Sequence, residues 1–194
     1  MKKSKKIILS ILSILIILLF ILEIFYNKEL TNFDLKISNY IWSYRNDKLT
    51  SIMKFLSFLG GSKFIILMLC ILFIFNKNYL IVLNMSISTI INHSLKRIFN
   101  RERPLNFLVK ESSKSFPSGH ASGSTSFYGY FIYLLYKKDI NNIIKVSLIS
   151  LLVLLILLIS FSRIYLGAHY LSDVVTGILV SALYLNIFIY YIEK

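Results

Sequence analysis

The stretch IILSILSILIILLFILEIFY (residues 7–26) decides the fold class, because it stays apolar over roughly the 20 residues that a helix needs to cross a bilayer. The chain begins MKKSKK (residues 1–6), and a basic start before an apolar run also occurs in signal peptides. Residues 22–26 contain none of the small residues of a cleavage site. We therefore expect an uncleaved first membrane helix.

The rest of the chain repeats this pattern. Five further apolar stretches, each close to the ~20 residues of a spanning helix, are separated by polar linkers. They lie at 57–76, 79–99, 120–136, 143–161 and 171–192. The stretch at 120–136 is the least hydrophobic of the six. The sequence predicts an all-α fold, a bundle of six transmembrane helices that forms a single integral membrane domain over residues 1–194.

Residues 29–48 have a different pattern. Apolar side chains recur there every three or four positions among Asn, Asp, Lys and Arg, which indicates an amphipathic helix. The aromatic residues Tyr40, Trp42 and Tyr44 favour the headgroup level of a bilayer. We expect an interfacial amphipathic helix between the first two spans.

The composition agrees with a membrane protein. Of the 194 residues 56% are hydrophobic and 16% are charged, with a mean hydropathy of +0.69, which disfavours a purely aqueous fold. The net charge of +13 fits nucleic acid, anionic lipid or an anionic substrate. Nucleic acid is the least favoured of these in so apolar a chain, and we expect no such partner. Cys70 cannot form an internal disulfide, and we expect it to pack in a helix.

The orientation rests on the basic N-terminus, because the first helix usually carries the most weight. A cytoplasmic N-terminus would put only nine of the 22 basic residues inside, so a bare count does not support this orientation. The nine are Lys2, Lys3, Lys5, Lys6, Lys77, Lys137, Lys138, Lys145 and Lys194. Many of the remaining basic residues belong to the three polar motifs described below, where a functional role would explain their charge. We expect a multi-pass protein of the cytoplasmic membrane.

The first of three polar motifs runs from Lys96 to Pro104. Arg103 follows Lys96 by seven positions, almost two helical turns, so that both can lie on one face. Pro104 disfavours helix at the preceding residue, and cations suit the C-terminal end of a helix. A basic cap that reaches the lipid headgroups is the alternative reading.

The second motif is Ser115-Phe-Pro-Ser-Gly-His120, directly before an apolar stretch. Ser118 is a good N-cap, and the free N–H groups of a helix start can bind an anion that Gly119 lets approach closely. His120 could exchange a proton near neutral pH. An ordinary capped helix with a chance histidine, or close helix packing at Gly119 and Gly123, stays possible.

The third motif runs from Ser162 to Asp173. His169 and Asp173 are four residues apart, so the carboxylate could hold one ring nitrogen and leave the other free to attack. An ionisable residue at the start of a membrane helix indicates a functional site. A purely structural His–Asp pair is the alternative.

Together the motifs resemble the signature of the type 2 phosphatidic acid phosphatase superfamily, which includes bacterial undecaprenyl-diphosphate and phosphatidylglycerophosphate phosphatases. That signature reads Lys-x6-Arg-Pro, Pro-Ser-Gly-His and Ser-Arg-x5-His-x3-Asp, and every defining residue is present in order within 96–173. Leu171 stands where many members have proline, and this difference alters none of the residues with a chemical role.

The resemblance implies a phosphate clamp and a covalent mechanism. The residues implied in phosphate binding are Lys96, Arg103, Arg163, Ser118 and Gly119. His169 is implied as the nucleophile that forms a phosphohistidine, Asp173 as its orienting carboxylate, and His120 as the general acid and base. Three fixed cations suit the charge of a phosphoryl transition state. We therefore expect a metal-independent phosphatase without a cofactor.

Four residues near the motifs receive separate interpretations. We take His93, one helical turn before Lys96, as structural or supporting. Arg97 and Arg101 are interpreted as headgroup contacts. Tyr165 is either an interfacial aromatic residue or part of the substrate entrance.

The substrate class is expected to be a lipid phosphate, with the site on the extracytoplasmic side. Undecaprenyl diphosphate is slightly favoured, while phosphatidylglycerophosphate, phosphatidic acid and a lipid A phosphate are also candidates. A lipid phosphotransferase and a non-catalytic lipid-binding or transport protein are the alternatives. The sequence does not determine the oligomeric state.

Overall fold

A computed structural model describes residues 3–76 and 78–194, and within these ranges the chain forms eight helices. The expected all-α class is confirmed. Lys2 and Lys77, two of the charges used for the orientation, lie outside the described residues. The helices are α1 (Lys3–Phe25), α2 (Asn27–Trp42), α3 (Asp47–Leu59), α4 (Ser62–Asn76), α5 (Tyr79–Phe99), α6 (Gly119–Lys137), α7 (Asn142–Tyr165) and α8 (Leu171–Ile192).

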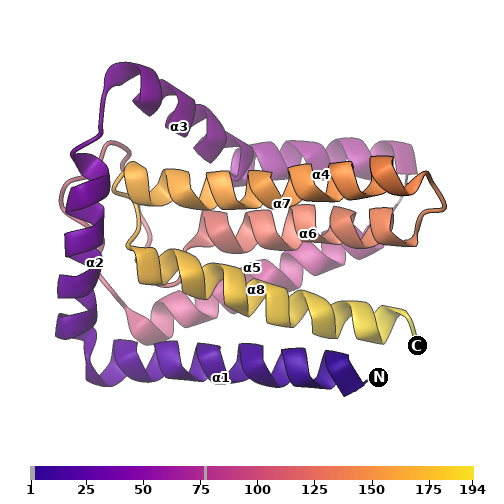
Figure 1. The fold of residues 1–194 in the computed structure, drawn as a ribbon, viewed down its shortest axis with the longest axis horizontal. Helices are drawn as coiled ribbons and strands as arrows, with labels where there is room; N and C mark the ends of the chain where they lie inside the picture. Colours follow the sequence, from indigo (N-terminus) through magenta and orange to yellow (C-terminus); the bar gives the residue numbers. More distant parts are fainter. Residues whose placement is uncertain (1–2, 77) are drawn as a thin grey trace.

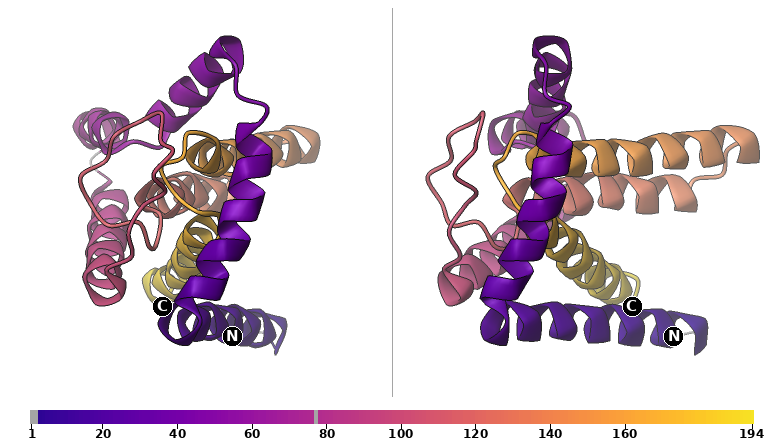
Figure 2. Two further views of the ribbon diagram at one scale, coloured as in Figure 1. Left: turned by 90° about the vertical axis from the view of Figure 1, so that its left-hand side faces the viewer. Right: turned by 60° about the vertical axis from the view of Figure 1, so that its left-hand side comes forward.

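The long helices run side by side along the long axis of the molecule, and α2 stands across one end of them (Figure 1). α6 lies at the centre and packs against α5, α7 and α8, while α1 packs along α8. Figure 2 shows the loop of residues 100–118 at the same end as α2. Both chain termini lie at the opposite end (Figure 1). One end of the bundle thus gathers α2 and the long loop.

Within the described residues, 3–76 and 78–194, three helices are long and apolar enough to cross a bilayer: α1 over Ile7–Phe25, α7 and α8. A fourth span is possible if α3 and α4, bent by 44° at their junction, act as one. Length and composition therefore give three to four spans and not the expected six. α5 falls short because polar side chains, among them Asn84, Ser88 and Asn92, lie on its buried face.

The expected span at 57–76 is wrong in its bounds, because it begins inside α3 and crosses the break at Gly60 and Gly61. α4 alone is 15 residues long, or about 22 Å at 1.5 Å per residue, which is short of the ~30 Å core. A Cβ atom at Gly60 would lie 2.4 Å from Ile159 of α7. Glycine at this bend therefore allows the close approach of α7.

The amphipathic helix expected at 29–48 is shorter than predicted. α2 ends at Trp42, and Asn46 starts α3 by accepting a hydrogen bond from the backbone N–H of Leu49 (2.9 Å). The face of α2 that is buried in the protein carries Asp34, Ser38 and Trp42, whereas Phe33 and Tyr40 are exposed. Its position at a membrane interface stays a prediction.

Candidate active site

The three motifs meet at the end of the bundle that α2 crosses. Lys96 lies in the last turn of α5, Gly119 begins α6, Arg163 lies in the last turn of α7 and Asp173 in the first turn of α8. Segments more than 70 residues apart in the chain are thereby joined, since Lys96 and Asp173 both contact Ser115. The structure brings together the site residues that the sequence singled out.

A tight turn between α7 and α8 presents His169. The backbone N–H groups of Ala168 and His169 both donate to the carbonyl of Arg163, at 3.0 and 3.3 Å. Gly167 within this turn has a φ of +69°, and a Cβ atom there would lie 2.2 Å from the carbonyl oxygen of Asn106. The turn therefore requires glycine, for its conformation and for the space.

The contacts of His169 define its tautomer. Nη1 of Arg103 lies 3.0 Å from Nε2 of His169, and because arginine can only donate, Nε2 must accept. The ring proton then resides on Nδ1, which lies 3.3 Å from Oγ of Ser115. Burial lowers the pKa of His169 well below its usual value, and the cations Arg103 and Arg163 act in the same direction. His169 is therefore a neutral imidazole whose unprotonated nitrogen is Nε2.

Asp173 holds the Nδ1 side of this imidazole. Its Oδ2 lies 3.5 Å from Nδ1 and accepts hydrogen bonds from the Ser115 hydroxyl and from the backbone N–H of Tyr170 (2.8 Å). The His169–Asp173 proximity expected from the spacing is confirmed. Ser115 lies between the two, and the sequence interpretation had given this residue no role of its own. Its place directly before the Pro-Ser-Gly-His motif was the available signal.

The three expected clamp cations take two kinds of partner. Lys96 donates to the backbone carbonyls of Lys114 and Ser115, at 2.5 and 3.2 Å. Arg103 donates to the carbonyls of Ser113 and Ala168, both at 2.6 Å. Carbonyl oxygens fix the directions of these two cations but carry no net charge, so both remain able to bind an anion.

Arg163 instead forms an ion pair with Glu111, a residue of the 100–118 loop. The side chain of Arg163 is only 2% exposed, and it also donates to the Ser57 hydroxyl. Glu111 did not emerge from the sequence, because a single glutamate in a loop has no distinguishing pattern. The carboxylate of Glu111 is thus paired with Arg163, one of the three cations expected to bind phosphate.

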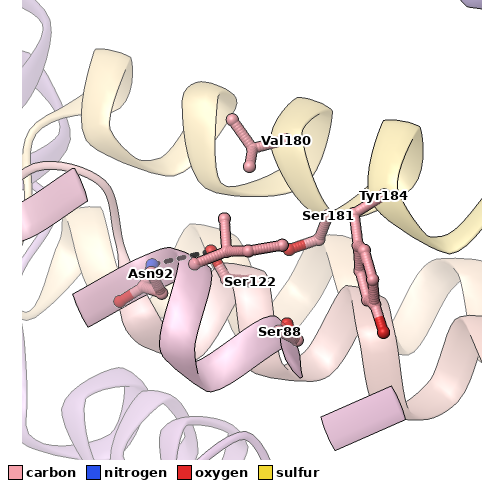
Figure 3. A pocket seen from close by; sticks show the side chains of 7 residues that line it. Ser88, Asn92, Ser122, Val180, Ser181 and Tyr184 are labelled. Carbon is pink, nitrogen blue, oxygen red and sulfur yellow. Dashed lines mark hydrogen bonds between the residues drawn. The ribbon is translucent and has the colours of Figure 1, made fainter. Parts of the chain in front are cut away.

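The start of α6 agrees with the second motif. Ser118 is its N-cap and accepts from the backbone N–H of Ala121 (3.4 Å). Nearby, Asn92 of α5 donates to the Ser122 hydroxyl (3.0 Å) in a polar seam between α5, α6 and α8 (Figure 3). A Cβ atom at Gly123 would make only ordinary contact. The Gly-x3-Gly spacing is therefore not a close helix contact.

A cavity of about 480 Å³ connects this polar end to the apolar flank of the bundle. Lys96, Gly119 and His120 line its polar part, and side chains of α4 and α5 such as Ile65 and Met85 line the remainder. A Cβ atom at Gly61 would lie 3.5 Å from Nε2 of His120, in ordinary contact, so the junction of α3 and α4 lies beside the imidazole.

Three residues differ from their interpretation, two of them near the motifs and one on α4. Arg101 is buried and ion-paired with carboxylates, so it is not a headgroup contact. Tyr165 is 1% exposed and its hydroxyl bonds Asn46 and Thr50 at the start of α3, so it is neither interfacial nor at an entrance. Cys70 is exposed on α4 rather than packed inside.

Two other interpretations stay open. His93 is exposed and lines the cavity beside Lys96, so a supporting role there remains a prediction. Arg97 is exposed on α5, which agrees with its interpretation as a headgroup contact.

Comparisons with known proteins identify the family of this chain. The family model of the PAP2 superfamily matches residues 77–194. The chain is 30% identical over 143 residues to phosphatidylglycerophosphatase B of Bacillus subtilis (strain 168), covering 69% of this chain and 70% of that protein.

Two solved structures are also similar. The crystal structure of a transmembrane PAP2 type phosphatidylglycerolphosphate phosphatase from Bacillus subtilis superposes with a TM-score of 0.85 at 26% identity, covering 96% of each chain. LpxE of Aquifex aeolicus has a TM-score of 0.65 at 26% identity, covering 82% of this chain and 94% of that one. The sequence motifs, the fold and the family match agree, and the chain belongs to the PAP2 superfamily of membrane lipid phosphatases.

Proposed function

We propose that this protein hydrolyses a phosphate ester on a membrane lipid through a phosphohistidine formed on His169. The observation that carries the proposal is the unprotonated Nε2 of His169, which accepts a hydrogen bond from Arg103 at 3.0 Å. A neutral imidazole with one fixed tautomer is a competent nucleophile, and the cations around it suit a phosphate.

In the first step, Nε2 of His169 forms a bond to phosphorus while the bond to the lipid oxygen breaks. His120, in its imidazolium form, gives a proton to that leaving oxygen and becomes neutral. Asp173 stabilises the positive charge that develops on the ring, with Ser115 as the bridge. Arg103 moves its donor from Nε2 to a phosphate oxygen, which frees the lone pair for attack.

In the second step, water attacks the phosphorus of the phosphohistidine and His120 accepts the proton of that water. The P–N bond breaks, and inorganic phosphate leaves with His169 neutral again. The clamp in both steps consists of Lys96, Arg103 and Arg163. Ser118 and Gly119 assist from the start of α6, where backbone N–H groups favour an anion.

The metal-independent mechanism is part of this proposal. Three cations already supply the positive charge that a phosphoryl transition state requires. Phosphate release should therefore proceed in EDTA at the same rate as without it.

The lipid character of the substrate is supported by the cavity of about 480 Å³ that leads from Lys96 and His120 to apolar side chains of α4 and α5. A phosphate at the polar part would leave its lipid tail against Ile65 and Met85. A site built in this way suits a membrane-anchored phosphate better than a freely soluble one.

We further propose that residues 1–194 form one membrane domain with six spans, in which α3 and α4 act together. α5 and α6 have 21 and 19 residues, close to the ~20 that a span needs. Polar residues such as Asn84 and Ser126 lie on buried faces, and Ser86, Thr89 and His93 of α5 line the cavity, so much of the lipid-facing side can stay apolar. A cytoplasmic N-terminus puts the site on the extracytoplasmic side, because the site and the termini lie at opposite ends (Figure 1).

For the physiological substrate, phosphatidylglycerophosphate is the first candidate, because two of the similar proteins are phosphatases of that lipid by name. Undecaprenyl diphosphate, favoured by the sequence interpretation, and phosphatidic acid remain candidates. Phosphate release from detergent-purified protein should be compared on these three lipids and a soluble phosphomonoester, with and without EDTA.

His169→Ala is the decisive variant in this panel. We expect it to lose phosphate release and the acid-labile phosphoryl adduct that wild-type protein forms with labelled substrate. Wild-type rates in His169→Ala would overturn the proposal. Label that appears on an acceptor lipid instead of in free phosphate would assign a phosphotransferase.

A further inference from the structure

Arg101 lies directly behind the proposed catalytic carboxylate. It belongs to the loop that follows α5, and its side chain is only 3% exposed. Nη1 donates to Oδ1 of Asp173 at 2.9 Å and to the Ser172 hydroxyl at 2.7 Å. Because Oδ2 of Asp173 faces His169, each carboxylate oxygen has its own partner on a different side.

The two N-terminal helices hold Arg101 from the other side. Nη2 donates to Oδ2 of Asp34 at 2.9 Å and to the Thr31 hydroxyl at 3.0 Å, both from α2. Glu23 of α1 lies 3.4 Å from Nη1. Asp34 also accepts from the backbone N–H of Ser172 at the start of α8 (3.1 Å). The arrangement ties α1 and α2 to the first turn of α8.

We infer that Arg101 is a positioning residue: it orients Asp173 toward His169, and the N-terminal helices hold it in place. A buried carboxylate without a cation tends to take up a proton, and a protonated Asp173 could not stabilise a charged imidazole ring. The guanidinium fork fixes both the charge and the direction of the carboxylate. This inference rests on the proposed function of the site.

The inference also implies that α1 and α2 contribute to catalysis by holding Arg101 in place. Both helices lie before the residues that the family model matches, 77–194. Glu23 and Asp34 come from these helices and supply the negative charge that keeps Arg101 buried.

Arg101 is separate from the phosphate clamp. It lines a different cavity, of about 520 Å³, together with Glu23, Asn27 and Tyr170. The Lys96–His120 cavity does not include it. A positioning role therefore predicts an effect on kcat with little effect on KM, because substrate binding keeps all of its own partners.

The test uses a charge-matched double variant, Arg101→Ala with Glu23→Gln, which removes one cation and one carboxylate and leaves the net formal charge of the cluster unchanged. Its kcat should fall about 100-fold, less than the ~10⁴-fold cost of removing an orienting carboxylate from a catalytic triad. KM should stay within about threefold. Added guanidinium should restore part of kcat, because the 520 Å³ cavity leads to the vacated position.

Arg101→Lys and Arg97→Gln complete the set. Arg101→Lys keeps the charge but loses the fork, so kcat should fall about tenfold with an unchanged melting temperature. Arg97→Gln, an exposed change on α5, should behave as wild type. If the double variant does not fold, Arg101→Lys decides the question.

Three results would overturn the inference: wild-type kcat in the folded double variant, wild-type kcat in Arg101→Lys, or a raised KM with unchanged kcat. His169→Ala is measured in the same panel. Full activity of His169→Ala would refute the proposed function itself, whereas an inactive His169→Ala with active Arg101 variants would refute only the inference.

Discussion

Glu111 provides the sharpest prediction, because its carboxylate pairs with Arg163 where a substrate phosphate is expected to bind. Substrate or product must displace it. Glu111→Gln removes the competing charge and should therefore strengthen the binding of inorganic phosphate, a product of the reaction. The same change should lower KM for the lipid substrate.

The magnitude follows from the exposure of the pair. A hydrogen bond to a charged group contributes about 1.5–3 kcal/mol. The Glu111 side chain is 29% exposed and that of Arg163 is 2% exposed, so solvent screening brings the estimate to the lower end, about 1.4 kcal/mol. That energy corresponds to about a tenfold lower inhibition constant for phosphate.

The assay measures competitive inhibition by inorganic phosphate, with the dephosphorylated lipid quantified by mass spectrometry because added phosphate masks the released product. Glu102→Gln is the matched control. It removes the same charge from the same loop, but Glu102 is 83% exposed at its side chain and pairs with Lys114. An unchanged or higher inhibition constant in Glu111→Gln would refute the reasoning. An equal shift in both variants would show that the effect comes from losing a negative charge in the loop and not from the ion pair with Arg163.

Three further predictions concern the chemistry, the cavity and stability. Ser115→Ala removes the hydroxyl between Asp173 and His169, so kcat for phosphate release should fall about 10- to 100-fold, the equivalent of a ~1.5–3 kcal/mol hydrogen bond; an unchanged kcat would contradict the bridge. Thr89→Trp places a large side chain in the cavity wall and should lower kcat/KM for a long-chain lipid phosphate while sparing a short-chain one; equal losses on both would count against a tail-binding cavity. Burial keeps the pKa of His169 in the folded protein below its usual value, whereas the same histidine in the unfolded chain takes up a proton near pH 6.5. The contribution of His169 to the free energy of unfolding is therefore highest above pH 6.5 and decreases as pH falls below it. Between pH 7.5 and 5.5 the wild type should lose about 1.4 kcal/mol more than His169→Gln in thermal unfolding, and parallel losses would show that His169 does not remain neutral.

The sequence alone determined the all-α membrane class and the motif residues of the proposed site. Helices form from local interactions, so the helices at residues 7–26 and 143–161 could be identified from the length and hydropathy of these runs. The motif residues could also be identified, because their types and fixed spacings, such as that of His169 and Asp173, are visible in the sequence itself.

Only the tertiary structure decided what surrounds those residues. Glu23, Asp34 and Glu111 come from separate segments, and none has a local pattern that marks it as a partner of Arg101 or Arg163. The break between α3 and α4 depends on the approach of α7 at Gly60, which no local spacing reports. Ion pairs and close helix contacts join positions distant in the chain, and their energies depend on burial. Burial is a property of the folded molecule, so the support of the site could be found only there.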